Sequence, residues 1–370
     1  MKSYSHLFER ICDLDNIIAA IDSASLGKRN RRDVKRVMQK KEKFALRTKE
    51  LLETRRFYIP EHKSKIIIDR GSGKARKIIC PRFLYEQIVH HAIMQQIMPI
   101  VMHGMYEYSC GSVPGRGSSY GRKYIERFIR NNPKKCRYVL KMDIRHYFQS
   151  IDHDILKTKL ARIFHDENLM WLLNMIIDSY VDDESGKGIP IGYYSSQWFS
   201  NFYLQDLDHF IKQELHAPCY VRYVDDMVIL GSNKRDLHKM RIRIEKELHK
   251  IGLEMKNNWQ IFKFDYNGKY RFIDFMGFRF YRNRTTLRRG TWNRAIRKSR
   301  TIKKAKKTSW YTASQMLSYL GFIQHIDCYN GYKTYILPNI NVKCLKALVS
   351  RKGKKDALEE CGKLCESCVA

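Results

Sequence analysis

The stretch Tyr220-Val221-Arg222-Tyr223-Val224-Asp225-Asp226-Met227-Val228-Ile229-Leu230 sets two adjacent carboxylates between two apolar, β-rich runs. This pattern predicts a β-hairpin with a tight corner at Val224-Asp225. Adjacent carboxylates repel each other and lose hydration when they are buried, so a hairpin tip rarely collects them for stability. Divalent metal ions relieve that repulsion, and two-metal phosphoryl transfer needs carboxylates that are held rigidly. A solvated acidic turn is the alternative, and the rest of the chain has to decide between the two.

A third carboxylate follows another predicted strand. Residues 138–140 are Tyr-Val-Leu and lead into Asp143, and the aromatic residue Phe148 comes shortly after it. Alone, Asp143 would be only an acidic residue at the end of a strand. Together with Asp225 and Asp226 it completes a set of three carboxylates, which is the set that two-metal chemistry uses.

The chain of 370 residues has a globular and strongly basic composition. It is 44% hydrophobic and 12% aromatic, which is typical of a folded protein with a large core and more than one subdomain. It carries 70 Lys and Arg against 38 Asp and Glu, a net charge of +32. Such an excess favours nucleic acid as the partner, with an anionic membrane second. The sequence shows neither a run long enough for a membrane span nor a signal peptide, so we expect no membrane association.

The ten cysteines are scattered and lie mostly in apolar settings, which indicates a reducing cytoplasm. Cys361, Cys365 and Cys368 form a cluster near the last residue, and Cys344 is a candidate fourth ligand. Zinc sites normally show paired spacings, which this cluster lacks. The spacing alone does not decide between a metal site and unliganded thiols.

Basic residues gather in three predicted segments. Residues 1–62 contain two helical patterns, and residues 28–49 place many Lys and Arg on one face of the second pattern. Residues 63–83 predict a hairpin whose basic tip, residues 70–74, suits a triphosphate. Residues 282–307 contain many basic residues and no acid, which predicts a basic helical segment facing a nucleic-acid backbone. Ordinary solvated surfaces are the alternative for each segment.

Taken in order, the motifs from Asp69 to about Phe280 resemble those of reverse transcriptases. The resemblance implies an α+β, right-hand polymerase fold with fingers, a palm built on an antiparallel sheet, and a helical thumb. It implies RNA-templated DNA synthesis from deoxynucleoside triphosphates by two-metal chemistry with two Mg²⁺ ions. The expected macromolecular partners are a structured template RNA and a cDNA/RNA duplex.

The resemblance also assigns roles to single residues. Asp143, Asp225 and Asp226 match the catalytic, metal-binding aspartates, and the carbonyl of Ile144 matches a further metal ligand. We expect Asp143 and Asp225 to bridge the metals and Asp226 to support them. Phe148 matches the aromatic gate that excludes a ribose 2′-hydroxyl. The remaining candidates are the nucleotide-binding residues Arg76, Lys74, Arg70, Ile191, Gly192 and Gln197, the primer grip Phe275, Met276 and Gly277, and the backbone-binding residues Arg294, Arg297, Lys298, Lys303 and Lys304.

One stretch points to a subfamily. Most reverse transcriptases begin the motif at residues 191–197 with Gln and end it with Pro, whereas this chain has Ile191 and Gln197. These two residues resemble the enzymes of diversity-generating retroelements, which misincorporate opposite template adenines and act with a ring-forming, basic accessory variability protein. Many reverse transcriptases carry a lysine near the position of Trp259, proposed to protonate pyrophosphate. Trp259 cannot do this, so another residue must, or the step proceeds without it.

We expect four segments: an N-terminal basic helical extension at 1–62, fingers and the first part of the palm at 63–215, the remaining palm at 216–281, and a basic helical thumb with a tail at 282–370. The expected setting is a bacterial or phage-encoded protein of the cytoplasm. Two alternatives stay open. One is an antiphage-defence or other bacterial reverse transcriptase, and the other is a catalytically silent RNA-binding scaffold. A group II intron protein is less favoured, because neither a maturase extension nor a nuclease His/Asn/Cys cluster is evident.

Overall fold

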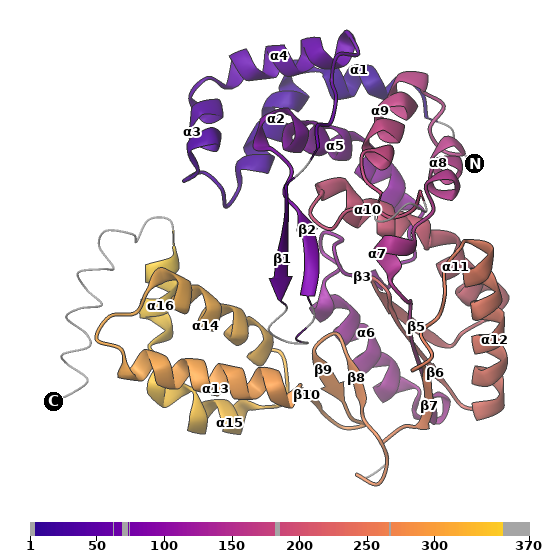
Figure 1. The fold of residues 1–370 in the computed structure, drawn as a ribbon. Helices are drawn as coiled ribbons and strands as arrows, with labels where there is room; N and C mark the ends of the chain where they lie inside the picture. Colours follow the sequence, from indigo (N-terminus) through magenta and orange to yellow (C-terminus); the bar gives the residue numbers. More distant parts are fainter. Residues whose placement is uncertain are drawn as a thin grey trace. The chain divides into compact units, whose positions relative to one another are not determined.

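The computed structural model describes residues 4–61, 63–68, 73, 75–181, 186–265 and 268–350, and its mixed helices and sheets confirm the predicted α+β class (Figure 1). Two compact units divide the chain. The first comprises Met1–Arg116, Leu140–Ile229 and Asn233–Ile261, and the second comprises Gly117–Val139, Leu230–Ser232 and the chain from Phe262 onward. The candidate residues Arg70 and Lys74, and the cluster Cys361, Cys365 and Cys368, lie outside the described residues.

The first unit begins with short helices where the sequence pattern predicts two longer ones. The first break is at Asp13, whose carboxylate accepts hydrogen bonds from the backbone N–H groups of Asp15 (3.1 Å) and Asn16 (3.2 Å) and so starts a new helix. The second break is at Lys40, which leaves helical geometry (φ −134°, ψ 45°). The helices are α1 (Leu7–Cys12), α2 (Leu14–Ser25), α3 (Arg32–Gln39), α4 (Lys41–Glu53) and α5 (Ile88–His103).

The predicted hairpin at 63–83 is present as an antiparallel pair, β1 (Ser64–Ile68) and β2 (Ala75–Ile79). Arg76 lies opposite Ile67 in its register. Every residue of β1 is exposed, and β2 becomes buried only at Ile79. The hairpin therefore reaches into solvent and is anchored at its base.

The central sheet has five strands in the order β3-β5-β6-β4-β7. Strands β5 and β6 form the predicted hairpin, with Val224 and Asp225 as the turn. At one edge β3 pairs in parallel with β5, a pairing that the sequence did not indicate. The strands are β3 (Ser109–Cys110), β4 (Tyr138–Asp143), β5 (Cys219–Tyr223), β6 (Asp226–Gly231) and β7 (Gln260–Lys263).

Apolar helix faces complete the core beside this sheet. Asp152 caps α8 through the N–H groups of Asp154 and Ile155, and Asn233 caps α12 through the N–H of Arg235. The first unit holds the helices α7 (Tyr147–Ser150), α8 (His153–Ala161), α9 (Glu167–Asp178), α10 (Tyr194–Tyr203), α11 (Gln205–His209) and α12 (Lys234–Lys250), with a kinked segment at Phe83–Gln87 and a short helical turn at Phe210–Glu214. Helix α6 (Ser118–Asn131) and the short turn at Pro133–Lys135 belong to the second unit.

The second unit holds a small antiparallel sheet and a group of helices. The prediction that all of 282–307 is helical is wrong for its first part, because residues 285–287 pair as a β-strand with residues 278–280. Among the described residues, no helix is long and apolar enough to cross a membrane. The elements are β8 (Ile273–Phe275), β9 (Phe278–Phe280), β10 (Thr285–Leu287), α13 (Arg289–Lys304), α14 (Trp310–Ile323), α15 (Tyr329–Tyr335), a short turn at Leu337–Asn339 and α16 (Val342–Val349).

Candidate active site

The tip of the β5–β6 hairpin, residues 223–226, is called the carboxylate turn below. Val224 has a positive φ of 58°, a conformation that a β-branched residue rarely adopts. Such backbone strain costs on the order of 1–3 kcal/mol and persists only where the surroundings enforce it. The strained residue directly precedes Asp225, so the strain lies where the carboxylates are presented.

Contacts from β3 and the residue after it hold the carboxylate turn in place. The N–H of Val224 donates to the carbonyl of Cys110 at 3.1 Å. Gly111 has a φ of 90°, and a Cβ added to it would lie 2.9 Å from Cγ2 of Val224. Glycine is therefore needed at this position, both for its backbone conformation and for the space that Val224 fills. The glycine- and serine-containing segment that begins at Ser109 thus supports the turn.

A second group of contacts joins the end of β4 to the segment before β7. Ile144 donates its N–H to the carbonyl of Asp225 at 3.3 Å and forms an antiparallel bridge with Met255. The N–H of Lys256 donates to the carbonyl of Asp143 at 2.8 Å. As a result, the ammonium Nζ of Lys256 lies 2.6 Å from Oδ1 of Asp143, a partner that the sequence analysis missed.

The electrostatics show that these carboxylates are crowded. Burial, followed by the negative charges of Asp143 and Asp226, raises the pKa of Asp225 from 3.8 to about 6. The nearby ammonium of Lys256 opposes this rise only in part. The site therefore holds more negative charge than its own cation offsets.

This excess charge fits a hard divalent cation, which prefers carboxylate oxygens. Among the described residues, no group of three His, Cys, Asp or Glu side chains stands ready in metal-binding geometry. Lys256 occupies one face of Asp143 instead. The donor set of Asp143, Asp225 and Asp226 is chemically suited to Mg²⁺, and the assignment of these residues as metal ligands remains a prediction.

Several candidate nucleotide-binding residues are linked through the backbone. The N–H of Ile79, at the end of β2, donates to the carbonyl of Ile191 at 2.8 Å, and the N–H of Ile189 donates to the carbonyl of Phe148 at 2.8 Å. Gly192 has a φ of 133°, and a Cβ there would lie 2.1 Å from the carbonyl oxygen of Ile79. Only glycine fits this approach, so the turn at Ile191 is fixed against the base of the hairpin.

The side chains of this region differ in exposure. Phe148 and Ile191 are half-buried, whereas Arg76 and Gln197 are exposed. Tyr147, the neighbour of Phe148, is 3% exposed and donates its hydroxyl to the carbonyl of Ser200. Phe148 is therefore the better placed of the two aromatic rings to meet a ligand.

Trp259, at the position where many reverse transcriptases carry a lysine, packs on α12. The guanidinium carbon of Arg241 lies 4.4 Å from its ring centroid, and the ring of His238 meets it edge-on at 5.9 Å. Lys256, three residues earlier, brings an ammonium to Asp143 instead. A lysine is thus present at the carboxylates, in a different sequence position.

The second unit carries the remaining candidates. Met276 and Gly277 have φ values of 51° and 86° and form the two-residue turn between β8 and β9, which is the conformation of a type I′ hairpin turn. Helix α13 buries Ala295, Ser299 and Ile302 along one side. Its basic candidates are the exposed Arg297, Lys303 and Lys304 and the half-buried Arg294 and Lys298.

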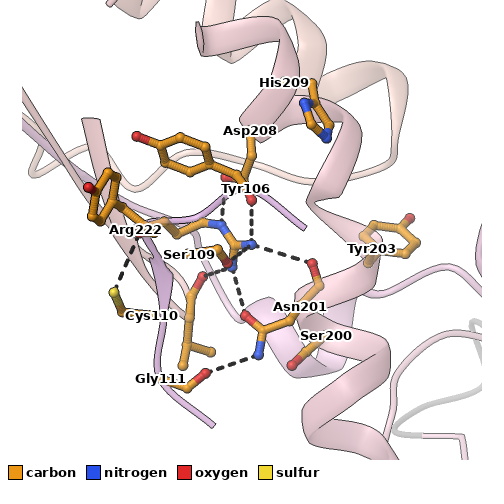
Figure 2. A network of polar contacts seen from close by, with 12 residues as sticks. Tyr106, Ser109, Cys110, Gly111, Ser200, Asn201, Tyr203, Asp208, His209 and Arg222 are labelled. Atoms are coloured by element: carbon orange, nitrogen blue, oxygen red, sulfur yellow. Dashed lines mark hydrogen bonds and ion pairs between the residues drawn. The ribbon is translucent and has the colours of Figure 1, made fainter. Parts of the chain in front are cut away.

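Directly behind the carboxylate turn lies a buried polar group, the Arg222 cluster, comprising Ser109, Asn201, Asp208, Tyr220 and Arg222 (Figure 2). Arg222 and Asp208 form an ion pair at 2.6 Å, with side chains 0% and 1% exposed. Burial lowers and Asp208 raises the pKa of Arg222, with a net rise. Sequence reasoning missed this cluster, because an arginine inside an apolar strand shows no partner until the chain is folded.

A five-stranded sheet whose hairpin carries adjacent acidic residues, together with its flanking helices, gives this chain a polymerase-like fold of mixed helix and sheet. Residues 47–280 match the family "Reverse transcriptase (RNA-dependent DNA polymerase)". The chain belongs to this family, which confirms the resemblance at the level of the reverse transcriptase domain.

Similar proteins extend the comparison. The "Uncharacterized 91 kDa protein in cob intron" of Schizosaccharomyces pombe is 28% identical over 211 residues, which cover 52% of this chain and 24% of that protein. Protein YkfC of Escherichia coli K12 is 24% identical over 162 residues, 42% of each chain. The chain thus spans less than half the length of either relative. A telomerase from Candida albicans, solved with a fragment of telomeric RNA, has a TM-score of 0.49 at 15% identity, covering 83% of this chain and 58% of that one.

Proposed function

We propose that this chain is an RNA-templated DNA polymerase. The observation that carries the proposal is the carboxylate turn, strained at Val224 and backed by β3, which presents Asp225 and Asp226 beside the strand end at Asp143 in a chain of the reverse transcriptase family. Rigid, crowded carboxylates are what nucleotidyl transfer requires. The four segments predicted from the sequence (1–62, 63–215, 216–281 and 282–370) remain part of this proposal.

Asp143 and Asp225 would hold the metal ions, with the carbonyl of Ile144 as a further ligand and Asp226 in support. When bound, Mg²⁺ would lower the pKa of the primer 3′-hydroxyl and offset negative charge on the triphosphate. Lys256 holds Asp143 in place through its ammonium and its backbone N–H. It must release the carboxylate, at least in part, when a cation binds there.

The deoxynucleoside triphosphate would bind between the hairpin β1–β2 and the turn at Ile191. Arg76, together with Arg70 and Lys74, supplies cations for the phosphates. Phe148 would lie under the sugar and exclude a 2′-hydroxyl, and Gly192 and Gln197 would line the same pocket. Replacing Phe148 by Ala should increase ribonucleotide incorporation, whereas Tyr147→Ala should mainly destabilise the fold, since Tyr147 is buried.

The nucleic-acid partners would bind the basic surfaces. Helix α13 presents Arg297, Lys303 and Lys304 on its exposed side, and the Phe275-Met276-Gly277 turn is the candidate primer grip. Phosphate contacts make binding fall steeply with salt. Charge reversal at Lys303 and Lys304 should flatten the salt dependence of RNA binding, and an unchanged slope would assign this face to another protein.

We further propose that the enzyme belongs to a diversity-generating retroelement and makes adenine-mutagenised cDNA. Ile191 supports this, because its side chain offers only shape and apolar contact where most reverse transcriptases resemble one another in having a Gln. Pockets that discriminate by packing alone distinguish substrates by roughly 1–3 kcal/mol. The fixed backbone at Ile191 and Gly192 means that this side chain, not a mobile loop, sets the contact. A ring-forming, basic accessory variability protein is the expected partner.

Primer extension by the purified chain on an RNA template, with dNTPs and Mg²⁺, tests the activity. Asp225→Asn is the inactive control. Sequencing the cDNA made by wild type and by Ile191→Gln tests the subfamily: wild-type errors should concentrate at template adenines, and Ile191→Gln should recover part of the accuracy. Evenly spread errors would favour an antiphage-defence or other bacterial reverse transcriptase, and RNA binding without extension would favour a scaffold. The DNA flanking the gene, with or without template and variable repeats, separates the first two.

A further inference from the structure

We propose that Arg222 is a positioning residue that holds the carboxylate turn in its strained conformation, an inference that rests on the proposed polymerase function. Nη1 of Arg222 donates to the carbonyl of Val224 at 2.9 Å. The N–H of Val224 donates to the carbonyl of Cys110. Hydrogen bonds therefore fix both the N–H and the carbonyl of the strained residue Val224. Without the arginine, the carbonyl side of this residue would lose the partner that the structure gives it.

The guanidinium is saturated by the rest of the cluster. Nε donates to Oδ1 of Asp208 at 2.8 Å, and Nη2 donates to Oδ2 of the same carboxylate at 2.6 Å. Nη2 also donates to the hydroxyl of Ser109 at 2.6 Å, and Nη1 donates to Oδ1 of Asn201 at 3.1 Å. A planar guanidinium with all of its N–H groups engaged has one orientation available, so Nη1 is aimed at the carboxylate turn.

The partners come from several parts of the first unit, as Figure 2 shows. Ser109 lies on β3, Asn201 on α10 and Asp208 on α11. Tyr220, two residues before Arg222 and therefore on the same side of β5, donates its hydroxyl to Oδ1 of Asp208 at 2.7 Å. Asn201 also donates to the carbonyl of Gly111 at 3.1 Å, which fixes the glycine against which Val224 packs.

A direct role toward substrate is excluded by burial and charge. Arg222 is 0% exposed, and Asp208 meets its charge in bidentate fashion, so it offers no donor to a phosphate. A purely structural role would be to hold α11 against β5. That role does not require the bond to Val224, and this difference allows the two roles to be separated by experiment.

The test replaces the pair by apolar residues, Arg222→Met with Asp208→Leu, because such a swap removes both buried charges and commonly preserves folding. We expect a melting temperature near that of wild type. The kcat for cDNA synthesis should fall on the order of 10²-fold, because Asp225 is no longer held in place. The KM for dNTP should change less than about threefold. The control is Arg122→Met with Glu126→Leu, an arginine–carboxylate pair (2.6 Å) of the second unit in which the arginine is buried and the carboxylate is half-buried. It should leave kcat unchanged.

The second part of the test asks whether a further substitution restores the kcat of the apolar-pair variant. Val224→Gly, added to the apolar-pair variant, should restore kcat at least about tenfold, because glycine adopts positive φ without strain and no longer needs the arginine. A folded apolar-pair variant with wild-type kcat would overturn the proposal, as would a failure of Val224→Gly to rescue. If the wild-type chain has no polymerase activity, Mn²⁺ titration followed by electron paramagnetic resonance still tests the positioning role. A several-fold weaker Mn²⁺ affinity in the apolar-pair variant, restored by Val224→Gly, supports that role. An unchanged affinity overturns it.

Discussion

Asp208 and Asp225 are both carboxylates of the first unit, the former fully buried and the latter half-buried, yet their electrostatic surroundings are opposite. Asp208 faces Arg222 through two hydrogen bonds and also accepts from Tyr220, so its charge is fully matched. Asp225 faces Asp143 and Asp226, and its pKa rises to about 6 because burial and like charges act together. The negative charge of Asp208 is balanced by Arg222 within the protein. The negative charge of Asp225 is not balanced in this way, which supports the proposal that this residue binds a cation.

Arg222 links the two regions, because it donates both to Asp208 and to the carbonyl of Val224, the residue that precedes Asp225. A half-buried, unbalanced set of charges tends to rearrange, since a small change of backbone lets a carboxylate reach more water. The Arg222 cluster counters that tendency with a rigid, fully bonded support directly behind the turn. The balanced ion pair of Arg222 and Asp208 thus supports the turn that carries the unbalanced carboxylates. The variants Asp208→Asn and Asp225→Asn separate the roles of the two carboxylates.

The largest effect is expected from Asp225→Asn on cDNA synthesis. Loss of this proposed metal ligand should lower the rate by more than about 10³-fold, because several kcal/mol of transition-state charge stabilisation would disappear. RNA binding, measured by filter retention, should be nearly unchanged. Asp154→Asn, an exposed residue in the first turn of α8, is the control and should retain full activity. Substantial synthesis by Asp225→Asn would remove this residue from the metal site.

Asp208→Asn should give the largest loss of stability. It leaves the buried guanidinium of Arg222 without a counter-charge, and breaking a buried pair in this way costs about 3–5 kcal/mol of unfolding free energy. Urea unfolding measures the loss. The control is Asp33→Asn, which breaks an exposed pair with Arg31 (2.6 Å) and should cost less than about 1 kcal/mol. Equal losses of unfolding free energy in both variants would contradict the idea that Asp208 and Arg222 balance each other's charge.

Asp225→Asn should do the reverse and stabilise the metal-free protein at pH 7. The pKa of Asp225 is higher in the folded chain than the ordinary value of 3.8, so the native state binds more protons than the unfolded state between about pH 4 and pH 6. The ionised carboxylate therefore destabilises the fold above pH 6, by on the order of 2–3 kcal/mol, and this penalty disappears as the pH falls toward 4. Melting curves of wild type and variant should converge at pH 4. Identical curves at pH 7 would show that Asp225 is not electrostatically strained.

A smaller effect is expected from Lys256→Met on metal affinity. Lys256 would compete with a cation bound by Asp143. Both side chains are 28% exposed, so the ion pair is worth about 1 kcal/mol. Removing it should tighten Mn²⁺ binding about fivefold in a titration followed by electron paramagnetic resonance. Lys250→Met, which removes an exposed lysine paired with Glu247, should change nothing. Weaker binding in Lys256→Met would instead mean that the lysine helps to place Asp143 for the metal.

Local patterns in the sequence were sufficient for part of this architecture. The hairpin at 220–230, the strand before Asp143 and the hairpin at 63–83 each follow from β-rich runs around turn residues, and all three are present. The helix breaks at Asp13 and Lys40 were missed because hydrophobic spacing continues across them, and only the capping geometry shows the break.

The supporting residues of the site could not be predicted in this way. Lys256 reaches Asp143 only because residues 254–256 pair with residues 143–145, more than a hundred positions away along the chain. Arg222 finds Asp208, Asn201 and Ser109 through contacts among a hairpin and three other elements. Hydrophobic periodicity in the sequence predicts neither of these two sets of contacts. Residue type therefore identifies the candidate catalytic groups, whereas tertiary structure is needed to find the residues that hold them in place.

The close approach of Gly192 to the carbonyl of Ile79 has a consequence for how such an enzyme can evolve. Any side chain at residue 192 would collide with the backbone, so this position is closed to variation. The adjacent residue 191 is half-buried and takes part in the turn through its carbonyl, which every amino acid possesses. If residue 191 sets copying accuracy, as we propose, single substitutions there would change the error rate while the surrounding backbone stays the same. A saturation library at this codon would measure the accessible range of error rates.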